Sequence, residues 1–207
     1  MAAHYLRMNA DSPDSQDLDV VVDVLRNGGL IIYPTDTVYG IGCDITNTKA
    51  LANLARFKGV KPEKANFSIV CHDLSHLSEY AKVSTPTYKL LKKAFPGAFT
   101  FILSASPKMP KFFKGKKTIG IRIPDNNIPR AIVERLGEPI ITTSVHDDDK
   151  IIEYTTDPHM IYENFKDQVD LVIDGGYGNN IPSTIVDYTG QEPLVVREGL
   201  GDLNGLL

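Results

Sequence analysis

Apolar stretches alternate with polar segments along the whole chain, and their spacing changes between a helical and an extended pattern. The first helical spacing follows the cap candidates Asp14 and Ser15. Its apolar positions are Leu18, Val21, Val22 and Leu25. Asn27-Gly28-Gly29 ends this predicted helix, and the apolar run over residues 29–33 predicts an inner strand.

The same alternation continues to the end of the chain. A second helix is expected to begin at the cap Thr48. A third is expected to begin at Thr85-Pro86 and to end at Pro96-Gly97. Two more helices are expected near residues 128–136 and 157–165. Further strands are expected over residues 67–71, 99–103, 118–123, 139–144, 170–173, 183–187 and 194–197. Helices alternating with strands are typical of an α/β domain, and we expect residues 1–207 to form a single one.

Composition agrees with one globular domain. The chain has 207 residues, of which 42% are hydrophobic, enough for a sizeable core. Polar residues at Asn9, Asp11 and Ser12 occupy the place of a signal-peptide core, and no long apolar run follows, so we expect a cytoplasmic protein without a membrane partner. Cys43 and Cys71 end apolar segments without zinc-like spacing, which predicts buried free thiols.

The net charge of −4 hides a segregation of charge along the sequence. From Lys82 to Arg130 the only acidic residue is Asp125, and the rest of the chain is acidic. The basic residues of this stretch are Lys82, Lys89, Lys92, Lys93, Lys108, Lys111, Lys114, Lys116, Lys117, Arg122 and Arg130. Two interpretations fit: a cationic surface for a nucleotide, pyrophosphate or RNA, or ordinary solvated lysines.

The most informative segment is the turn over residues 34–42, which follows the strand over residues 29–33 directly. Ligands of open α/β sheets bind at such strand ends. Thr35 and Thr37 supply hydroxyl groups, and Gly40 and Gly42 allow the backbone to approach a small ligand closely. The alternative interpretation is a plain connection between two elements.

Polar residues also mark the ends of later strands. Arg122 lies near the end of the apolar strand over residues 118–123, where a charge is costly unless it meets an anion. Its partner is either a ligand carboxylate or phosphate, or an acidic side chain of the protein itself. Hydroxyl groups or an arginine similarly edge the strands at Thr142-Thr143-Ser144, Ser183 and Arg197.

The stretch Tyr33-Pro34-Thr35-Asp36-Thr37-Val38-Tyr39-Gly40 resembles the opening signature of the YrdC/YciO family. The segments 29–42, 97–103, 118–125, 137–144 and 182–199 resemble that family in order and spacing, across nearly the whole chain. The resemblance implies a YrdC-like fold: a twisted, open, mixed sheet flanked by helices, with a concave basic surface. It also implies a single domain without the C-terminal extension domain of some relatives.

Members of this family combine L-threonine, bicarbonate and ATP into threonylcarbamoyl-adenylate and release pyrophosphate. Partner proteins then pass the threonylcarbamoyl group to adenosine 37 of tRNA, which gives the t6A modification. The resemblance therefore implies a nucleotidyltransferase that binds ATP with Mg2+ as a substrate complex and holds no tightly bound cofactor. Positioning and electrostatics would supply most of the catalysis, without a side-chain nucleophile.

The resemblance also assigns roles to residues. Thr35, Thr142 and Ser183 would hold the threonine, and Arg122 would pair with its carboxylate. The residues implied on the ATP side are Lys58, Thr118, Ser144 and Arg197. Lys58, Arg122 and Ser144 would act in catalysis. No metal site is expected: His72 and His76 lack a zinc motif, and adjacent acids such as Asp147-Asp148-Asp149 are usually solvated.

Two motifs depart from the synthase pattern. The usual Lys-x-Arg-Pro is replaced by Lys58-Gly59-Val60-Lys61-Pro62, and the usual Ser-Ala-Asn by Ser144-Val145-His146. A lysine cannot reproduce a bidentate guanidinium. Both changes affect the ATP side and resemble the YciO branch, as does the stretch over residues 67–75.

A second function class therefore stays open beside the enzyme. The basic surface could bind tRNA or double-stranded RNA through phosphates, with weak sequence preference and strong salt dependence. The lysines expected there are Lys61, Lys64, Lys114, Lys116 and Lys117. Threonine- and bicarbonate-dependent cleavage of ATP would indicate the enzyme, and RNA affinity without turnover would indicate the binding module.

Overall fold

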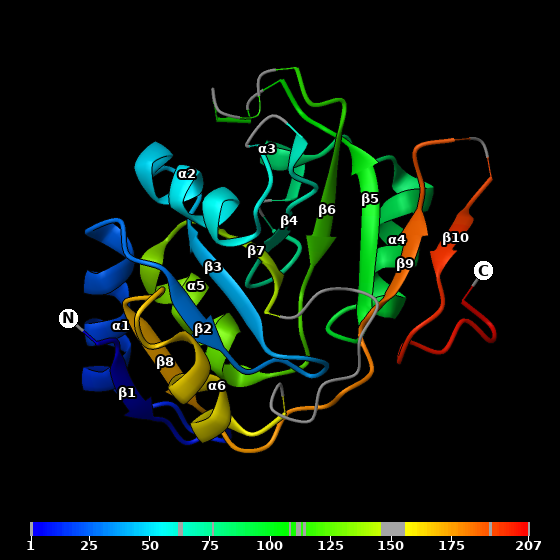
Figure 1. Cartoon of the computed structure of the whole chain (residues 1–207). Helices are drawn as coiled ribbons and strands as arrows, with labels where there is room; N and C mark the ends of the chain where they lie inside the picture. Colours follow the sequence, from blue (N-terminus) through cyan, green and yellow to red (C-terminus); the bar gives the residue numbers. More distant parts are fainter. Residues whose placement is uncertain are drawn as a thin grey trace.

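A mixed β-sheet with helices on both faces forms the centre of the molecule (Figure 1). The computed structural model describes residues 2–61, 64–75, 77–107, 109–110, 113, 115–145, 156–190 and 192–206. Within these residues the strands are β1 (His4–Arg7), β2 (Ile31–Tyr33), β3 (Gly40–Asp44), β4 (Ser68–Val70), β5 (Phe99–Ser104), β6 (Thr118–Arg122), β7 (Ile140–Ser144), β8 (Leu171–Asp174), β9 (Thr184–Asp187) and β10 (Leu194–Arg197). The helices are α1 (Ser15–Arg26), α2 (Thr48–Phe57), α3 (Leu77–Tyr80), α4 (Thr85–Ala94), α5 (Asn127–Leu136) and α6 (Pro158–Phe165).

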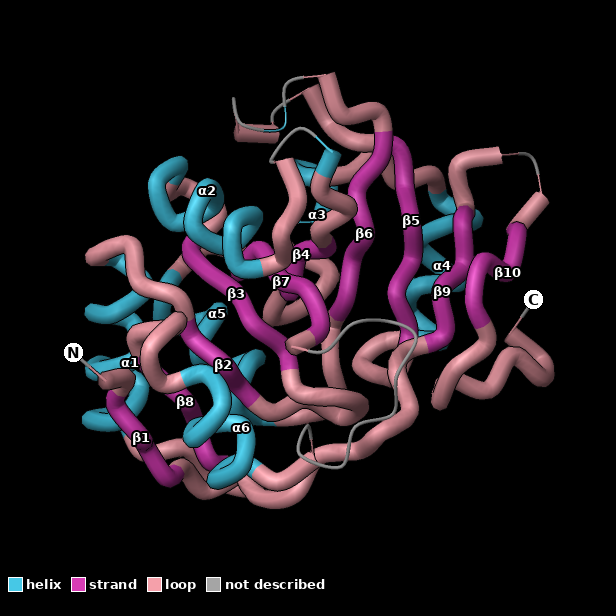
Figure 2. The backbone as a smooth tube through the Cα atoms, in the orientation of Figure 1, coloured by secondary structure: helices cyan, strands magenta, loops and turns pink. Residues whose placement is uncertain are grey.

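The strand order is β1-β8-β2-β3-β7-β4-β6-β5-β9-β10, so that the first and last strands of the chain form the two edges. Neighbours pair in both directions: β1 with β8, for example, is parallel, and β2 with β3 is antiparallel. Figure 2 shows the strands turning progressively across this open sheet. The expected twisted, open, mixed α/β sheet is thus confirmed.

The alternation of side chains along the strands distributes the core between the two faces of the sheet. Ile31 and Tyr33 face the helices α1 and α5, whereas Ile32 faces the larger apolar cluster that includes residues of α2, α4 and α6. All three β2 side chains are buried because helices cover both faces of this strand.

The predicted helices are present, with small shifts at their starts. Asp14 caps α1 as expected and accepts a hydrogen bond from the Gln16 backbone N–H. The cap of α2 is Asn47, not Thr48, and the cap of α4 is Ser84, not Thr85. In both cases the capping residue has an extended backbone and accepts from a backbone N–H three residues later, so the expected cap becomes the first helical residue.

Three elements were not predicted: β1, α3 and β3. The strand β3 begins inside the segment that the sequence suggested was one long turn. Its glycines also have different roles, since a Cβ on Gly42 would come within 2.5 Å of the Ile141 carbonyl oxygen of β7. Gly42 therefore permits close strand packing.

Cys43 and Cys71 are both free and buried, as predicted. Burial raises the pKa of the Cys71 thiol to about 12. No helix within the described residues is long and apolar enough to span a membrane.

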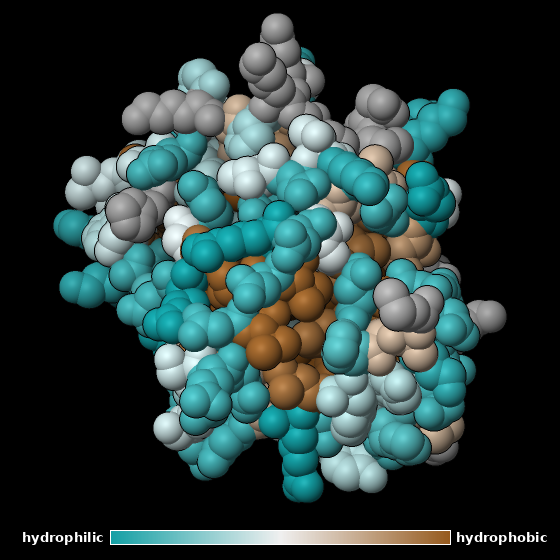
Figure 3. Space-filling model, turned by 90° about the vertical axis from the view of Figure 1, so that its left-hand side faces the viewer, coloured by the Kyte–Doolittle hydropathy of each residue, from teal (hydrophilic) through white to brown (hydrophobic). Residues whose placement is uncertain are grey.

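An apolar patch lies on the side of the molecule formed by α1 and β1 (Figure 3). The exposed or half-buried apolar side chains of these elements include Leu6, Leu18, Val20 and Val24.

Candidate active site

On one face of the central strands, a row of neighbouring side chains that crosses the strands is entirely apolar. Strand register places six fully buried side chains side by side: Cys43, Ile141, Ile69, Ile121, Phe101 and Val186. The next row on the opposite face contains Gly42, Thr142, Ser68 and Gly120. A sheet with short polar or absent side chains on one face leaves room there for a ligand.

This polar row lies on the same face as α5, but beyond the part that the helix covers. Val70 and Ile140 pack with α5 residues, and Ser68 and Thr142 point to the same side of the sheet two positions further along their strands. A cleft of about 120 Å³ occupies the uncovered area. It is lined by Val38, Tyr39, Gly40, Asn66, Ser68, Thr100, Arg122, Thr142, Thr143, Ser144, Pro182, Ser183, Ile185 and Arg197.

The turn after β2 is fixed by its own hydroxyl groups. Thr35 Oγ1 accepts from the Thr37 backbone N–H at 3.0 Å, donates to the Val38 carbonyl at 2.8 Å, and lies 3.1 Å from Thr37 Oγ1. These contacts use the hydrogen-bonding capacity of Thr35 within the turn. Thr35 lines a neighbouring hollow with residues 177–180 and is absent from the lining of the cleft.

Of the two partners that the sequence left open for Arg122, the structure shows the acidic side chain of the protein itself. Arg122 Nη2 donates to Asp36 Oδ1 and to Thr37 Oγ1, both at 3.0 Å, so it forms an internal ion pair. The side chain also lines the cleft. Burial lowers the pKa of Arg122, and the Asp36 carboxylate opposes this effect.

The ion pair is incompletely satisfied. Arg122 Nε and Asp36 Oδ2 are buried, and neither has a hydrogen-bond partner among the described residues. Buried polar atoms are almost always hydrogen-bonded, so two orphaned atoms in one pair mark a place where a partner is missing. A ligand carboxylate would supply an acceptor for Nε.

The hydroxyl of Thr142 is hydrogen-bonded to a buried tyrosine. Tyr33 Oη donates to Thr142 Oγ1 at 2.6 Å, and Thr142 Oγ1 donates to the Ile41 carbonyl at 3.2 Å. Burial raises the pKa of Tyr33 to about 12, so the phenol remains a hydrogen-bond donor into the alkaline range. Thr142 itself lines the cleft.

The opposite wall comes from β5, β9 and β10. Ser183 Oγ lies 2.8 Å from Thr100 Oγ1, and both residues line the cleft. Arg197 donates to the Ser183 carbonyl from Nε at 3.2 Å and from Nη2 at 2.9 Å. Ser183, which the resemblance assigned to threonine, and Arg197, which it assigned to ATP, therefore lie in direct contact.

Of the remaining predicted residues, Ser144 belongs to the lining of the cleft, and Lys58 and Thr118 do not. Ser144 lines it, and Lys58 Nζ donates to the Ser144 carbonyl at 3.4 Å. Thr118 begins β6 opposite Ser104 and is not a lining residue. His146 and Asp147-Asp148-Asp149 lie outside the described residues.

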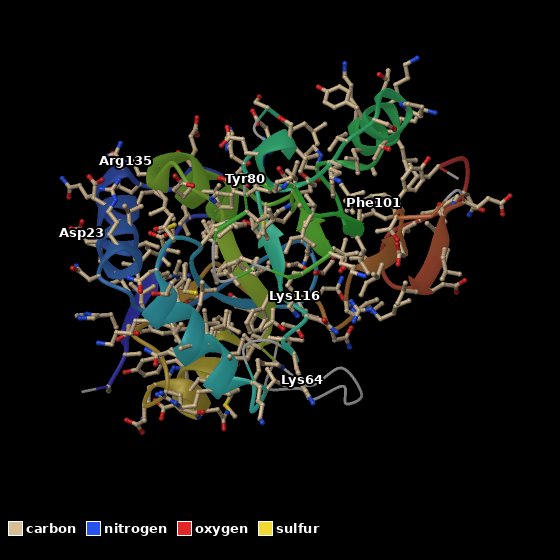
Figure 4. The ribbon with its side chains drawn as sticks, turned by 90° about the horizontal axis from the view of Figure 1, so that it is seen from above. Asp23, Lys64, Tyr80, Phe101, Lys116 and Arg135 are labelled. Atoms are coloured by element: carbon tan, nitrogen blue, oxygen red, sulfur yellow. The ribbon has the colours of Figure 1, made fainter. Side chains whose placement is uncertain are left out.

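The lysines expected to bind RNA are mostly exposed. Lys61, Lys64 and Lys117 are exposed, and Lys114 lies outside the described residues. Lys116 Nζ donates to the Ala65 carbonyl at 2.8 Å, which joins the segment before β6 to the segment before β4. Figure 4 shows Lys64 and Lys116 in these neighbouring segments.

The lining residues that sequence reasoning did not assign to the site include Asn66, Ser68, Thr100 and Tyr39. Thr100 and Ser68 interrupt apolar strands with a hydroxyl, which is a usable signal once the strand alternation is known. Asn66 precedes β4 in a connection whose path the sequence alone does not specify.

A larger hollow of about 470 Å³ lies at the other ends of β4 and β7, beside Cys71 and Pro139. Its carboxylates include Glu138, which accepts from Tyr80 Oη at 3.0 Å, and Glu134, which lies 3.8 Å from His72 Nε2. It contains none of the predicted site residues. We therefore assign the candidate active site to the smaller cleft.

Comparison with known proteins identifies the family. A protein-family model described as Sua5/YciO/YrdC, telomere recombination, matches residues 23–199. The uncharacterised protein YciO of Escherichia coli is 38% identical over 208 residues, covering 99% of this chain and 100% of that protein. An uncharacterised protein of Haemophilus influenzae is 38% identical over 203 residues, covering 96% of this chain and 97% of its own.

Solved structures agree. The crystal structure of E. coli YciO has a TM-score of 0.90 at 37% identity and covers 99% of this chain and 100% of its own. Sua5 of P. abyssi, solved in complex with L-threonine, has a TM-score of 0.83 at 25% identity; the match covers 96% of this chain and 58% of that one. The full-length relatives, the solved folds and the family model lead to one conclusion: the chain belongs to the Sua5/YciO/YrdC family.

Proposed function

We propose that the protein is an ATP-dependent synthase of the threonylcarbamoyl-adenylate type, linked to the t6A modification of tRNA. The observation that carries this proposal is the orphaned Arg122 Nε beside a cleft that also presents the hydroxyls of Thr142 and Ser183. A guanidinium with a spare donor binds a carboxylate, and adjacent hydroxyls hold the other polar groups of a small amino acid. The complex of the related Sua5 with L-threonine supports the same ligand class.

The size of the cleft favours a small ligand. Its volume of about 120 Å³ is below the ~300–1,000 Å³ of pockets that hold drug-sized molecules. A nucleotide would therefore extend beyond it, toward Lys58 beside Ser144.

The proposed roles of the side chains follow from their charge and position. Arg122 binds and orients the carboxylate of threonine, and Thr142 and Ser183 fix its remaining polar groups. Lys58 and Arg197 provide positive charge near the phosphates of ATP while the α-phosphorus is attacked. Bicarbonate supplies the carbamoyl carbon. Catalysis then depends on positioning and charge neutralisation, and no side chain needs to form a covalent intermediate.

Magnesium would accompany ATP. Among the described residues, no group of three or more His, Cys, Asp or Glu side chains is arranged to hold a metal ion. Mg²⁺ commonly binds through nucleotide phosphates and water, and we propose that it arrives with ATP in this way.

A second candidate function is binding of tRNA or double-stranded RNA. The observation that favours it is the exposure of Lys61, Lys64 and Lys117 around the segments joined by Lys116. Lysines in such positions bind phosphates without reading sequence. This function is compatible with the synthase and would suit a protein that acts beside tRNA-modification partner proteins.

The proposed reaction is tested by incubating the purified protein with Mg-ATP, bicarbonate and L-threonine. We expect pyrophosphate release and threonylcarbamoyl-adenylate, detected by mass, and we expect both to require threonine and bicarbonate. A YrdC enzyme under the same conditions is the positive control. Absence of product where that control turns over would reject the synthase and favour the RNA-binding candidate.

A further inference from the structure

Tyr33 reaches the floor of the cleft across a neighbouring strand. It is fully buried at the end of β2, and it pairs with Gly40 of β3, which in turn pairs with Ser144 of β7. Since Gly40 has no side chain, the phenol extends over it and donates to Thr142 Oγ1. A Cβ on Gly40 would lie 3.1 Å from Tyr33 Cζ and 3.3 Å from Thr142 Oγ1.

The two hydrogen bonds of Thr142 determine what its hydroxyl can offer to a ligand. A hydroxyl has one proton and two lone pairs. The proton goes to the Ile41 carbonyl, and the Tyr33 phenol occupies one lone pair. The remaining lone pair can only accept, so Thr142 faces the cleft as a hydrogen-bond acceptor.

Without Tyr33 this polarity would not be fixed. The Ile41 carbonyl is 3.2 Å from Thr142 Oγ1, a longer contact than the 2.6 Å to Tyr33 Oη. A threonine hydroxyl with free lone pairs can rotate and donate to a ligand oxygen as readily as it accepts. The cleft would then distinguish poorly between ligand donors and ligand acceptors at this position.

We propose that Tyr33 is a positioning residue, which makes Thr142 an acceptor for an N–H or O–H group of the ligand. The inference rests on the proposed function and deepens it. Arg122 supplies donors at one part of the cleft and Thr142 an acceptor at another. This polarity suits a small acid that carries a hydrogen-bond donor, as L-threonine does with its ammonium and hydroxyl groups, and disfavours a small dicarboxylate.

The test is a double-mutant cycle on the affinity for L-threonine, measured by calorimetry. The proteins are the wild type, Tyr33→Phe, Thr142→Val and the double variant. Tyr33→Phe keeps the ring and removes only the donor, and we expect it to weaken binding by about tenfold, the upper range for one hydrogen bond. In the Thr142→Val background we expect Tyr33→Phe to have no further effect.

Two controls separate positioning from a general loss of structure. Tyr80→Phe removes a phenol that donates to Glu138 in the other hollow, and it should bind threonine as the wild type does. Thr142→Ser is the conservative variant that keeps the hydroxyl, and adding Tyr33→Phe to it should again cost about tenfold.

The outcomes are distinguishable. Unchanged binding by Tyr33→Phe, or an equal loss in the Thr142→Val background, would overturn the positioning role and leave the proposed function standing. An equal loss in Thr142→Ser and Thr142→Val would also overturn it, because the hydroxyl would then not be the group that matters. If the wild type itself does not bind threonine, the proposed function fails, and the positioning role fails with it.

Discussion

Arg122 Nη2 lies 3.0 Å from Asp36 Oδ1, in an ion pair whose two side chains are each 11% exposed. The pair joins the end of β6 to the turn after β2, which are 86 residues apart in sequence. Its other two buried atoms, Arg122 Nε and Asp36 Oδ2, lack partners in the described part of the chain. The pair therefore joins β6 to the turn, and one buried donor and one buried acceptor within it have no partner among the described residues.

Asp36→Ala should destabilise the protein by about 3–5 kcal/mol, because it leaves a buried guanidinium without its countercharge. Urea unfolding followed by circular dichroism measures this change. Arg122→Ala should have a similar cost, and the double variant should lose less than the sum of the two. Strict additivity would show that the pair does not act as a unit. Arg135→Ala, which breaks an exposed ion pair with Asp19, is the control and should cost at most about 1 kcal/mol.

Gly40→Ala should weaken L-threonine binding by at least about tenfold, because its methyl group would crowd Thr142 Oγ1 inside the cleft. Calorimetry measures the affinity, and a thermal melt shows whether the fold is retained. Gly190→Ala is the matched control, since the nearest atom to its Cβ would be the Glu192 carbonyl oxygen at 3.6 Å. Equal affinities for the two variants would place the ligand away from Gly40.

The Tyr33 phenol should make stability depend on pH in the alkaline range. Its pKa rises from 10.0 to about 12 in the folded protein because of burial. Above pH 10 the unfolded chain loses this proton and the folded protein keeps it, so the stabilisation is complete below pH 10 and is lost as the pH rises toward 12. The loss amounts to about 1.4 kcal/mol for each pH unit in that window.

Unfolding free energies of the wild type and Tyr33→Phe at several pH values between 9 and 12 isolate this effect. The difference between the two proteins should be constant at the lower end and shift in favour of the variant as the pH rises. A constant difference over the whole range would mean that Tyr33 titrates normally in the folded protein.

If RNA binds to the exposed lysines, each of Lys61→Ala, Lys64→Ala and Lys117→Ala should lower the slope of log affinity against log salt by about 1. Fluorescence anisotropy with labelled double-stranded RNA measures this slope. Lys89→Ala in α4 is the control, as an exposed lysine away from these segments. Equal slopes for all four variants would remove the lysines from the interface.

The alternating strands and helices of an α/β domain were predictable because they have clear periodicity and strong caps, whereas the mixed sheet was expected from the family resemblance. Residues 118–122 and 140–144, for example, form strands within one residue of the predicted bounds. Sequence reasoning missed β3 because Gly40 and Gly42 read as turn residues, and only the close contact with Ile140 and Ile141 explains why a strand needs a glycine there.

The site was harder to predict because side-chain partners depend on register between distant strands. Arg122, Thr142, Ser183 and Arg197, to which the resemblance assigned ligand roles, all line one cleft. Thr35 was assigned to the ligand, but its hydroxyl is used within the turn. Whether Asp36 or a ligand would pair with Arg122 was undecidable from sequence, because it depends on the path of a turn 86 residues away.

The most direct test of the account is a calorimetric titration of the wild-type protein with L-threonine and, separately, with L-threonine methyl ester. The two ligands differ in the carboxylate that Arg122 is proposed to bind. We predict measurable binding of L-threonine and at least about a hundredfold weaker binding of the ester, since the charge-assisted hydrogen bonds to Arg122 are lost. Equal affinities for the two ligands, or no binding of either, would contradict the assignment of this cleft as a small amino-acid site.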